Sequence, residues 1–157
     1  MTTSLTRARG LLDTSTLVLL PRLDASALPA EPMITAVTLA ELSVGPLVAQ
    51  DNQERMERQA QLQQAEADFD PLPFDAAAAR AFGRVSAALR RRGGKTAARA
   101  YDAMIAATAI ANQLPVYTCN PADFAGIDDL VLSHLPSHLR GSWAIRSRIS
   151  IHRRRGG

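Results

Sequence analysis

The sequence of 157 residues contains a single cysteine, Cys119, and few aromatic residues. One thiol cannot form an internal disulfide, so it excludes a disulfide-stapled secreted scaffold, and it has no second thiol for a zinc knuckle. The four Phe, two Tyr and one Trp leave a core that must consist mainly of Ala, Leu, Val and Ile. Such a core suits helices packed on a sheet. We therefore expect a protein of a reducing compartment and place it in the cytoplasm.

Long hydrophobic runs are also lacking. The longest uncharged stretch covers residues 103–122, and Asn, Gln and Pro residues interrupt it. A membrane-spanning helix needs about 20 predominantly apolar residues. Near the N-terminus, Asp13 interrupts the apolar stretch that follows two arginines, which disfavours a signal peptide. We therefore expect no secretion, no membrane span and no membrane partner.

Acidic residues are absent after Asp129. Residues 130–157 contain six arginines, whereas the first 129 residues carry 12 basic and 15 acidic side chains. The length and the 46% hydrophobic fraction suit one domain. We predict an N-terminal leader (1–9), one domain (10–136) and a basic C-terminal tail (137–157). A basic tail favours a polyanionic partner such as nucleic acid, and a plain solubilising end explains it about equally well.

Strand-like and helix-like segments alternate along the predicted domain. The patterns predict strands at 10–12, 32–35, 69–74, 115–118 and 130–132, and helices at 16–22, 36–47, 51–68, 76–92 and 97–113. Helices that separate strands imply a parallel sheet joined by right-handed crossovers. We therefore expect an α/β fold: a three-layer α/β/α sandwich with a mostly parallel central sheet of four to five strands.

Four carboxylates are expected at one edge of this sheet. Asp13 follows the first strand, Glu41 lies in the helix after the second, and Asp123 follows the strand that ends at Thr118. Asp102 reaches the same edge because its helix begins there. Ligands of such sheets bind beyond the carboxyl ends of the strands. Carboxylates so near to one another would repel each other, and a bound cation relieves the repulsion. Oxygen ligands without a Cys/His cluster favour Mg²⁺ or Mn²⁺.

Each acid also has a simpler explanation. Asp13 could cap a helix, residues 38–41 and 120–123 resemble capping boxes, and Asp102 could complement a helix N-terminus. These separate roles do not explain why four acids converge. Hydrolysis of a phosphodiester suits such a site, because a metal activates water and a carboxylate can orient or deprotonate it. An aspartyl phosphotransferase is disfavoured, because Ser15 stands where the haloacid-dehalogenase pattern needs a second aspartate.

Four segments carry the acids: LDTS at 12–15, TLAEL at 38–42, DAMIAATA at 102–109 and TCNPADF at 118–124. Together they resemble the PIN domain over about residues 10–135, and within it the VapC-like ribonuclease toxins of bacterial toxin–antitoxin pairs. The resemblance implies a PIN-like fold and Mg²⁺- or Mn²⁺-dependent endonucleolytic cleavage of structured RNA, such as transfer or ribosomal RNA. The implied catalytic residues are Asp13, Glu41, Asp102 and Asp123, with Asp13, Asp102 and Asp123 as metal ligands.

Further side chains are expected around these acids. The implied polar support comes from Thr14, Ser15, Thr118 and Asn120. A basic cluster near the start of the Asp102 helix could contact RNA phosphates: Arg90, Arg91, Arg92, Lys95 and Arg99. Arginines in a last helical turn before Gly93 are also what a capped helix end requires. Cys119 stands where many relatives carry Arg, which removes one possible phosphate contact.

The resemblance also implies partners. It predicts a homodimer that a small VapB-like antitoxin holds inactive by inserting a segment into the crevice. Operator DNA would be bound only through that antitoxin, and RNA would be the substrate. The alternative is a non-catalytic PIN-fold module that binds RNA or a protein partner. Retention of all four acids argues against this alternative.

Overall fold

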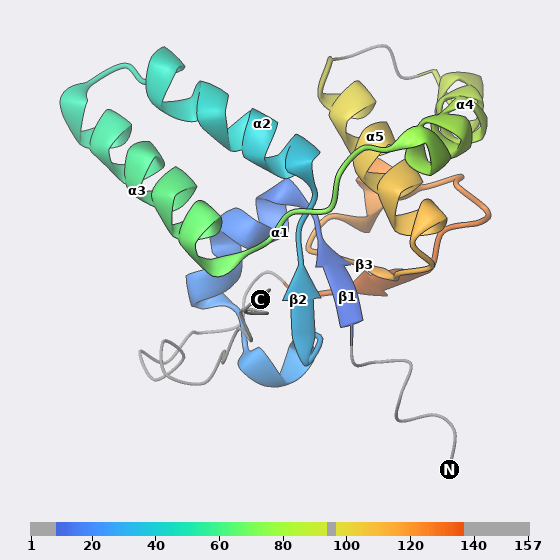
Figure 1. The fold of residues 1–157 in the computed structure, drawn as a ribbon, viewed down its shortest axis with the longest axis horizontal. Coiled ribbons are helices and arrows are strands. Elements are labelled where there is room, and N and C mark those ends of the chain that lie inside the picture. The colour runs from blue at the N-terminus through green and yellow to red at the C-terminus, as the bar shows by residue number, and fades with distance from the viewer. Residues whose placement is uncertain (1–8, 94–96, 137–157) are drawn as a thin grey trace, which may run out of the picture.

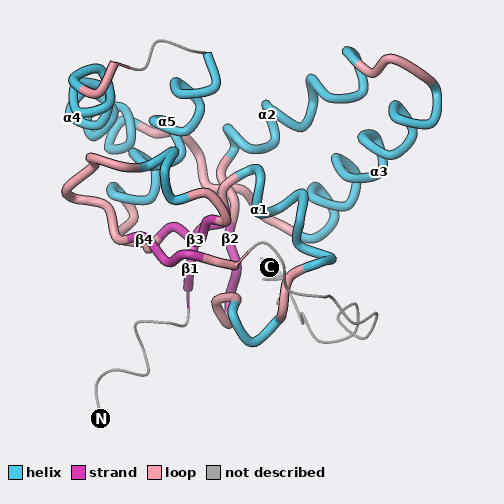
Figure 2. Tube along the Cα trace, turned by 180° about the vertical axis from the view of Figure 1, so that it is seen from behind, coloured by secondary structure: helices cyan, strands magenta, loops and turns pink. Residues whose placement is uncertain are grey.

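Four parallel strands form the central sheet of the protein, in the order β2-β1-β3-β4. The computed structural model describes residues 9–93 and 97–136. The strands are β1 (Arg9–Leu12), β2 (Glu31–Met33), β3 (Val116–Thr118) and β4 (Leu132–His134), drawn side by side in Figure 2. The predicted leader apart from Arg9, the predicted basic tail and Lys95 lie outside the described residues. The expected parallel α/β fold is confirmed, with four strands.

In the part of the chain that the structure describes, five α-helices pack around the sheet: α1 (Thr14–Leu19), α2 (Ala36–Val44), α3 (Asn52–Asp68), α4 (Ala76–Arg91) and α5 (Ala97–Ala111). Figure 1 shows two helix pairs above the strands, α2 with α3 on one side and α4 with α5 on the other. Short 3-10 segments follow α1, α2 and β3. Among the described residues, no helix is both long and apolar enough to cross a bilayer.

Both faces of the sheet are covered by apolar side chains. Leu11 and Val116 belong to the cluster that packs against α4 and α5, whereas Leu12 and Tyr117 belong to the cluster that contains residues of α1, α2 and α3. Successive residues of a strand point to opposite faces, so two adjacent leucines serve two cores. This sequence pattern is typical of a buried parallel strand.

The chain reverses its direction of winding at β1. It passes from β1 to β2 on one side and then returns across the sheet to β3 on the other side. The carboxyl ends of β1 and β3 therefore meet at a topological switch point, where parallel sheets form ligand crevices. Asp13 directly follows β1, and Thr118 ends β3.

The long helix α4 shows how local sequence sets an element. Asp75 caps it by accepting a 3.0 Å hydrogen bond from the backbone N–H of Ala78. Ala78, Val85 and Leu89 are buried along one stripe, as their spacing predicts. The helix ends at its last arginines, and Gly93 follows with a φ of 85°, which a residue without a Cβ adopts most readily.

One predicted strand is absent and another is displaced along the chain. Residues 69–74 form no strand, and only Leu72 makes an isolated bridge, to Thr35. Pro71 and Pro73 flank it and have no N–H to continue a ladder. The last strand is Leu132–His134 rather than 130–132, because the backbone N–H of Leu130 is used in a turn to the carbonyl of Ile127.

The predicted first helix also differs. Helix α1 begins two residues earlier than expected, at Thr14, because Asp13 caps it. It ends at Leu19, and the chain tightens into a 3-10 turn over Leu20–Arg22. Pro21 lies in that turn and cannot donate a hydrogen bond to continue an α-helix.

Candidate active site

Asp13 is held in one orientation between two strands. Its Oδ1 accepts a 3.1 Å hydrogen bond from the backbone N–H of Thr16, and its Oδ2 accepts hydrogen bonds from the hydroxyls of Thr118 at 2.7 Å and Ser15 at 3.3 Å. Only 2% of the residue is exposed. Asp13 is thus a helix cap, as its position predicts, and also part of the crevice between β1 and β3.

The loop after β3 is fastened to α1 by the same group of side chains. The Thr118 hydroxyl accepts a 3.0 Å hydrogen bond from the backbone N–H of Asn120 while it donates to Asp13. The hydroxyl of Thr16 accepts one from the backbone N–H of Cys119, at 3.1 Å. These bonds fix the path of the chain that carries the next acid, Asp123.

Glu41 reaches the site from the middle of α2. Its Oε1 accepts a 2.7 Å hydrogen bond from the hydroxyl of Thr14, the first residue of α1. Burial raises the pKa of Glu41 above its usual range, the hydrogen bond from Thr14 partly offsets this, and the charge of Asp13 adds to the increase. The carboxylate is therefore held in place and only partly solvated.

Asp102 lies in the second turn of α5 and is the most strongly perturbed acid of the site. Burial, followed by the negative charges of Asp123, Glu41 and Asp13, raises the pKa of Asp102 to about 7, and the charge of Arg99 opposes the increase. Burial is thus the main cause of the raised pKa of Asp102, and three neighbouring acids add to it.

Asp123 lies in the 3-10 segment Pro121–Phe124 and is partly buried. Its Oδ2 accepts a 2.9 Å hydrogen bond from the side-chain amide of Asn120. The predicted capping box is wrong here, because the Asn120 side chain makes no capping bond. Asn120 instead holds the carboxylate of Asp123.

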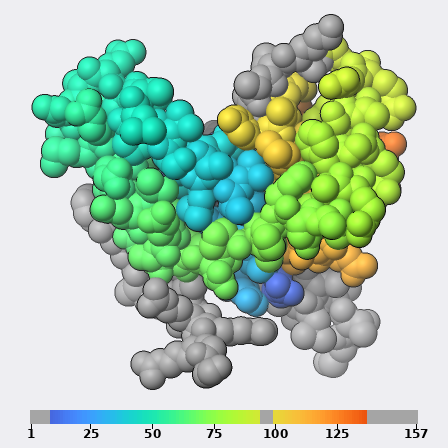
Figure 3. All heavy atoms as spheres, turned by 45° about the horizontal axis from the view of Figure 1, so that its top comes forward, coloured from blue at the N-terminus to red at the C-terminus, as the bar shows by residue number. Residues whose placement is uncertain are grey.

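The structure thus brings the four predicted acids together around one crevice. Figure 3 shows the surface hollowed between α2, which carries Glu41, and α5, which carries Asp102. Within the described residues, none of the four acids takes part in an ion pair. In the same part of the chain, no three Asp, Glu, His or Cys side chains form a group that could enclose an ion as they stand. The crevice is acidic, but its carboxylates do not form a closed set of ligands around one point.

The second predicted capping box is also wrong. Thr35, not Thr38, caps α2, by accepting a hydrogen bond from the backbone N–H of Thr38. The Thr38 hydroxyl lies 3.0 Å from that of Thr14, which contacts Glu41. The sequence pattern did not single out Thr35 or Thr38 as part of the site. The one sequence feature that could have indicated them is a pair of threonines three residues apart, which follows a strand and precedes an acid on the same helix.

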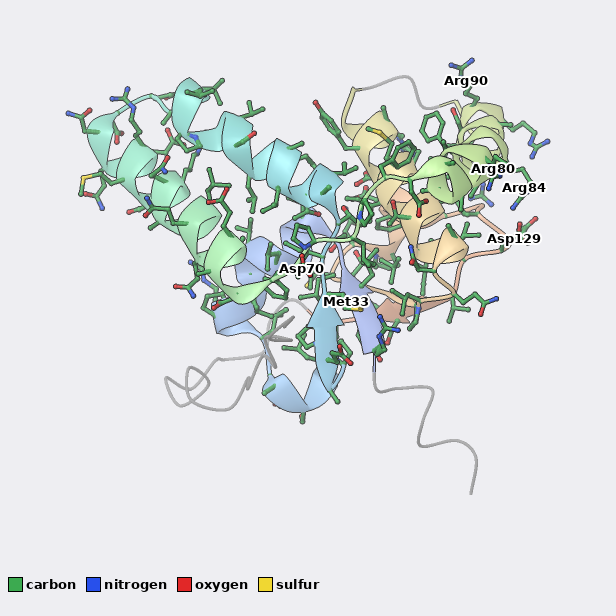
Figure 4. The ribbon with its side chains drawn as sticks, in the orientation of Figure 1. Met33, Asp70, Arg80, Arg84, Arg90 and Asp129 are labelled. Carbon is green, nitrogen blue, oxygen red and sulfur yellow. The ribbon has the colours of Figure 1, made fainter. Side chains whose placement is uncertain are left out.

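The predicted basic cluster is divided between two helices. Arg90 and Arg91 are exposed in the last turn of α4, and Arg92 is the residue at its C-terminal cap. Figure 4 shows Arg90 projecting outward from the end of α4. Arg99, in the first turn of α5, is partly buried, and its charge lowers the pKa of Asp102.

A separate groove lies away from the acids. It has a volume of about 600 Å³ and is lined by Pro46, Leu47, Arg55, Met56 and Gln59, from the turn after α2 and the first half of α3. Leu47 is 84% exposed and Met56 is 68% exposed. Large apolar side chains gathered at one place on a surface are typical of a protein interface.

Comparisons with known proteins give consistent results. A match to the PIN domain covers residues 11–130. Ribonuclease VapC5 of Mycobacterium tuberculosis is 40% identical over 128 residues, which are 80% of this chain and 92% of that protein. The fold is similar to the VapBC-5 toxin–antitoxin structure from Mycobacterium tuberculosis, with a TM-score of 0.69 and 36% identity over 81% of this chain and 98% of that chain. It is also similar to FitAcB from Neisseria gonorrhoeae, with a TM-score of 0.61 and 26% identity over 82% and 99% of the two chains.

Proposed function

The chain belongs to the PIN-domain family, and from this premise we propose that it is a VapC-type ribonuclease toxin. The reaction is endonucleolytic hydrolysis of an RNA phosphodiester by an activated water molecule. The observation that carries the proposal is the crevice of four carboxylates at the switch point, where the charges of three acids act on Asp102. Four carboxylates would repel a negatively charged substrate unless a cation is bound between them.

The residues of the crevice fit a divalent cation. Burial and then like charges raise the pKa of Asp102 to about 7, and within the described residues no Lys or Arg forms an ion pair with the four acids. Asp13, Asp102 and Asp123 would hold the ion, which is Mg²⁺ or Mn²⁺ by the chemistry of the donor set. Mg²⁺ commonly keeps several waters and uses one or two carboxylates, so a closed cage is not needed. When bound, the ion would lower the pKa of water and offset charge on the phosphate.

The side chains of this protein have separate parts in the reaction. Asp13 is fixed by three hydrogen bonds and provides a rigid oxygen donor at the end of β1. Glu41 keeps Oε1 on Thr14, so its Oε2 can accept a hydrogen bond from the attacking water. A partly buried carboxylate with a raised pKa is suited to accept the proton of that water. Asn120 steadies Asp123.

The substrate is structured RNA, of the transfer or ribosomal class. Arg99 supports this proposal because its charge acts on the acidic crevice itself. The exposed Arg90, Arg91 and Arg92 stand at the adjoining end of α4 and suit phosphate contacts. Cys119 has no charge that could attract a phosphate, whereas an arginine at this position would. The arginines near α5 therefore contribute more of the attraction for RNA than they would beside such an arginine.

A VapB-like antitoxin is the proposed partner, and the toxin is proposed to form a homodimer. Support comes from the VapBC-5 structure, a relative at 36% identity, and from the exposed apolar side chains of the groove at Leu47 and Met56. An antitoxin that crosses this groove and inserts a segment into the crevice would block both substrate and metal. Contact with operator DNA through the antitoxin stays a prediction of the family resemblance.

The test is incubation of purified, antitoxin-free protein with total cellular RNA in Mg²⁺ or Mn²⁺. Discrete fragments are expected, and they should vanish with EDTA and in the Asp102→Asn variant. A folded protein that binds Mn²⁺ weakly or not at all and leaves all RNA intact would instead favour a non-catalytic PIN-fold binding module.

A further inference from the structure

A chain of three threonine hydroxyls ends on the carboxylate of Glu41. The hydroxyl of Thr35 lies 3.5 Å from that of Thr38, which lies 3.0 Å from that of Thr14, which donates to Glu41 Oε1 at 2.7 Å. Thr35 and Thr38 are completely buried, and Thr14 is partly buried. Three elements contribute: the segment after β2, helix α2 and the first turn of α1.

The carboxylate fixes the direction of every hydrogen bond in this chain. A hydroxyl has one proton to donate, and an ionised carboxylate can only accept. Thr14 therefore donates to Glu41 and must accept from Thr38. Thr38, whose proton is then used, accepts from Thr35. Hydrogen bonds aligned in one direction polarise and strengthen one another in a water-poor interior.

Thr38 does not make the bond that a helical threonine usually makes. Such a hydroxyl commonly bonds the backbone carbonyl four residues earlier. Thr108 in α5 does so, donating to the carbonyl of Met104 at 2.8 Å. The carbonyl four residues before Thr38 belongs to Ile34, which precedes the N-cap of α2 and accepts a hydrogen bond from the backbone N–H of Leu72. The hydroxyl of Thr38 contacts two other hydroxyls, that of Thr35 at the N-cap of α2 and that of Thr14 in α1.

We propose that Thr38 is a positioning residue for the active site: by donating to Thr14 it holds the Thr14 hydroxyl on Glu41 and so fixes that carboxylate. This inference rests on the proposed ribonuclease function. Thr38 touches neither RNA nor the reacting atoms and acts through Thr14 alone. Without it, Thr14 loses its donor and can rotate away, which removes the hydrogen bond from Thr14 to Glu41. Small displacements of a catalytic group cost rate more than binding.

The test compares two substitutions at one position. Thr38→Val keeps the shape and removes the hydroxyl, whereas Thr38→Ser keeps the hydroxyl. For cleavage of the RNA that the wild type cuts, we expect Thr38→Val to lower kcat roughly 10-fold with little change in KM, and Thr38→Ser to stay within about 2-fold. Thr108→Val is the matched control, because it also removes a fully buried threonine hydroxyl, and there Tm should fall while kcat is retained.

The result that overturns the proposal is equal kcat for Thr38→Val and Thr108→Val per folded molecule, or a Thr38→Ser variant as slow as Thr38→Val. Crystal structures of both Thr38 variants keep the test independent of activity. The Thr14–Glu41 hydrogen bond should be lost or split between rotamers in Thr38→Val and intact in Thr38→Ser. If the wild type cuts no RNA, the proposed function fails, and these structures still decide the positioning role: an unchanged Glu41 in Thr38→Val refutes it.

Discussion

The hydroxyl of Thr118 donates a 2.7 Å hydrogen bond to Oδ2 of Asp13, although the two residues are 105 positions apart in the sequence. The bond joins the carboxyl ends of β1 and β3, the two strands at the switch point. Both residues are buried, so the bond is shielded from water. It links the stability of the sheet to the orientation of an acid proposed to hold the metal.

Removing the Thr118 hydroxyl should therefore affect folding and activity together. Thr118→Val leaves one bond fewer on a buried carboxylate, and we expect a loss of about 1–3 kcal/mol in the free energy of unfolding. Thr118→Ser should recover most of it. Urea unfolding of the two variants measures the difference. A Thr118→Val protein as stable as the wild type would mean that the bond contributes little.

Asp102 should be indispensable for cleavage. Asp102→Asn removes a carboxylate from the proposed metal site and should reduce RNA cleavage by roughly 100-fold or more, because metal binding, and with it the activation of water, depends on it. Single-turnover cleavage of a defined RNA measures the loss. Asp128→Asn is a suitable control, since Asp128 is exposed in another part of the fold. Equal losses in the two variants would argue against a specific role.

The metal-free protein should lose stability as the pH rises from about 4 to about 7. The pKa of Asp102 is raised from 3.8 to about 7 by burial and by neighbouring acids, so the folded state binds its proton more tightly than the unfolded state does. Stability from this group is complete below about pH 4 and is lost by about pH 7. After allowance for solvent screening of a partly exposed group, the change is on the order of 1–2 kcal/mol.

Thermal unfolding in EDTA at several pH values measures this dependence. Asp102→Asn should flatten the profile and be more stable than the wild type at pH 8, because no charge develops at position 102. The proposal for Asp102 is wrong if the variant and the wild type have parallel profiles.

Divalent metal should stabilise the folded protein. An ion that binds only the folded state at 100 times its Kd adds about 2.7 kcal/mol to the free energy of unfolding. We therefore expect Mn²⁺ to raise Tm by several degrees and EDTA to reverse the increase. The Asp102→Asn variant should show a smaller increase. If Mn²⁺ leaves the Tm of the wild type unchanged, the crevice is not a metal site.

An aspartate in the apolar groove should weaken antitoxin binding. Leu47 is 84% exposed, and burying it in a complex would contribute about 1.5–3 kcal/mol, or roughly 10- to 100-fold in affinity. Leu47→Asp should lower affinity for the cognate antitoxin by such a factor in titration calorimetry. Val131→Asp changes another exposed apolar residue, outside the groove, and serves as the control. Unchanged affinity for Leu47→Asp would place the antitoxin elsewhere.

The composition of the site could largely be predicted from the sequence. Asp13 and Asp123 follow apolar strands, and polar residues in that position mark the carboxyl edge of a parallel sheet. The alternation of strands and helices predicts Glu41 and Asp102 at the same edge. The roles of Thr35 and Thr38 could not be predicted, because their hydroxyls depend on Thr14, which approaches from another helix.

The sequence by itself determined the features that arise from neighbouring residues: the apolar stripe of α4, its cap at Asp75 and the alternation that makes the sheet parallel. Only the tertiary structure decided the strand order β2-β1-β3-β4, the loss of a strand at 69–74 and the bond from Thr118 to Asp13. Caps and periodicity act over a few residues and leave a local signal. Strand order and a raised pKa at Asp102 depend on groups that meet only when the whole chain has folded.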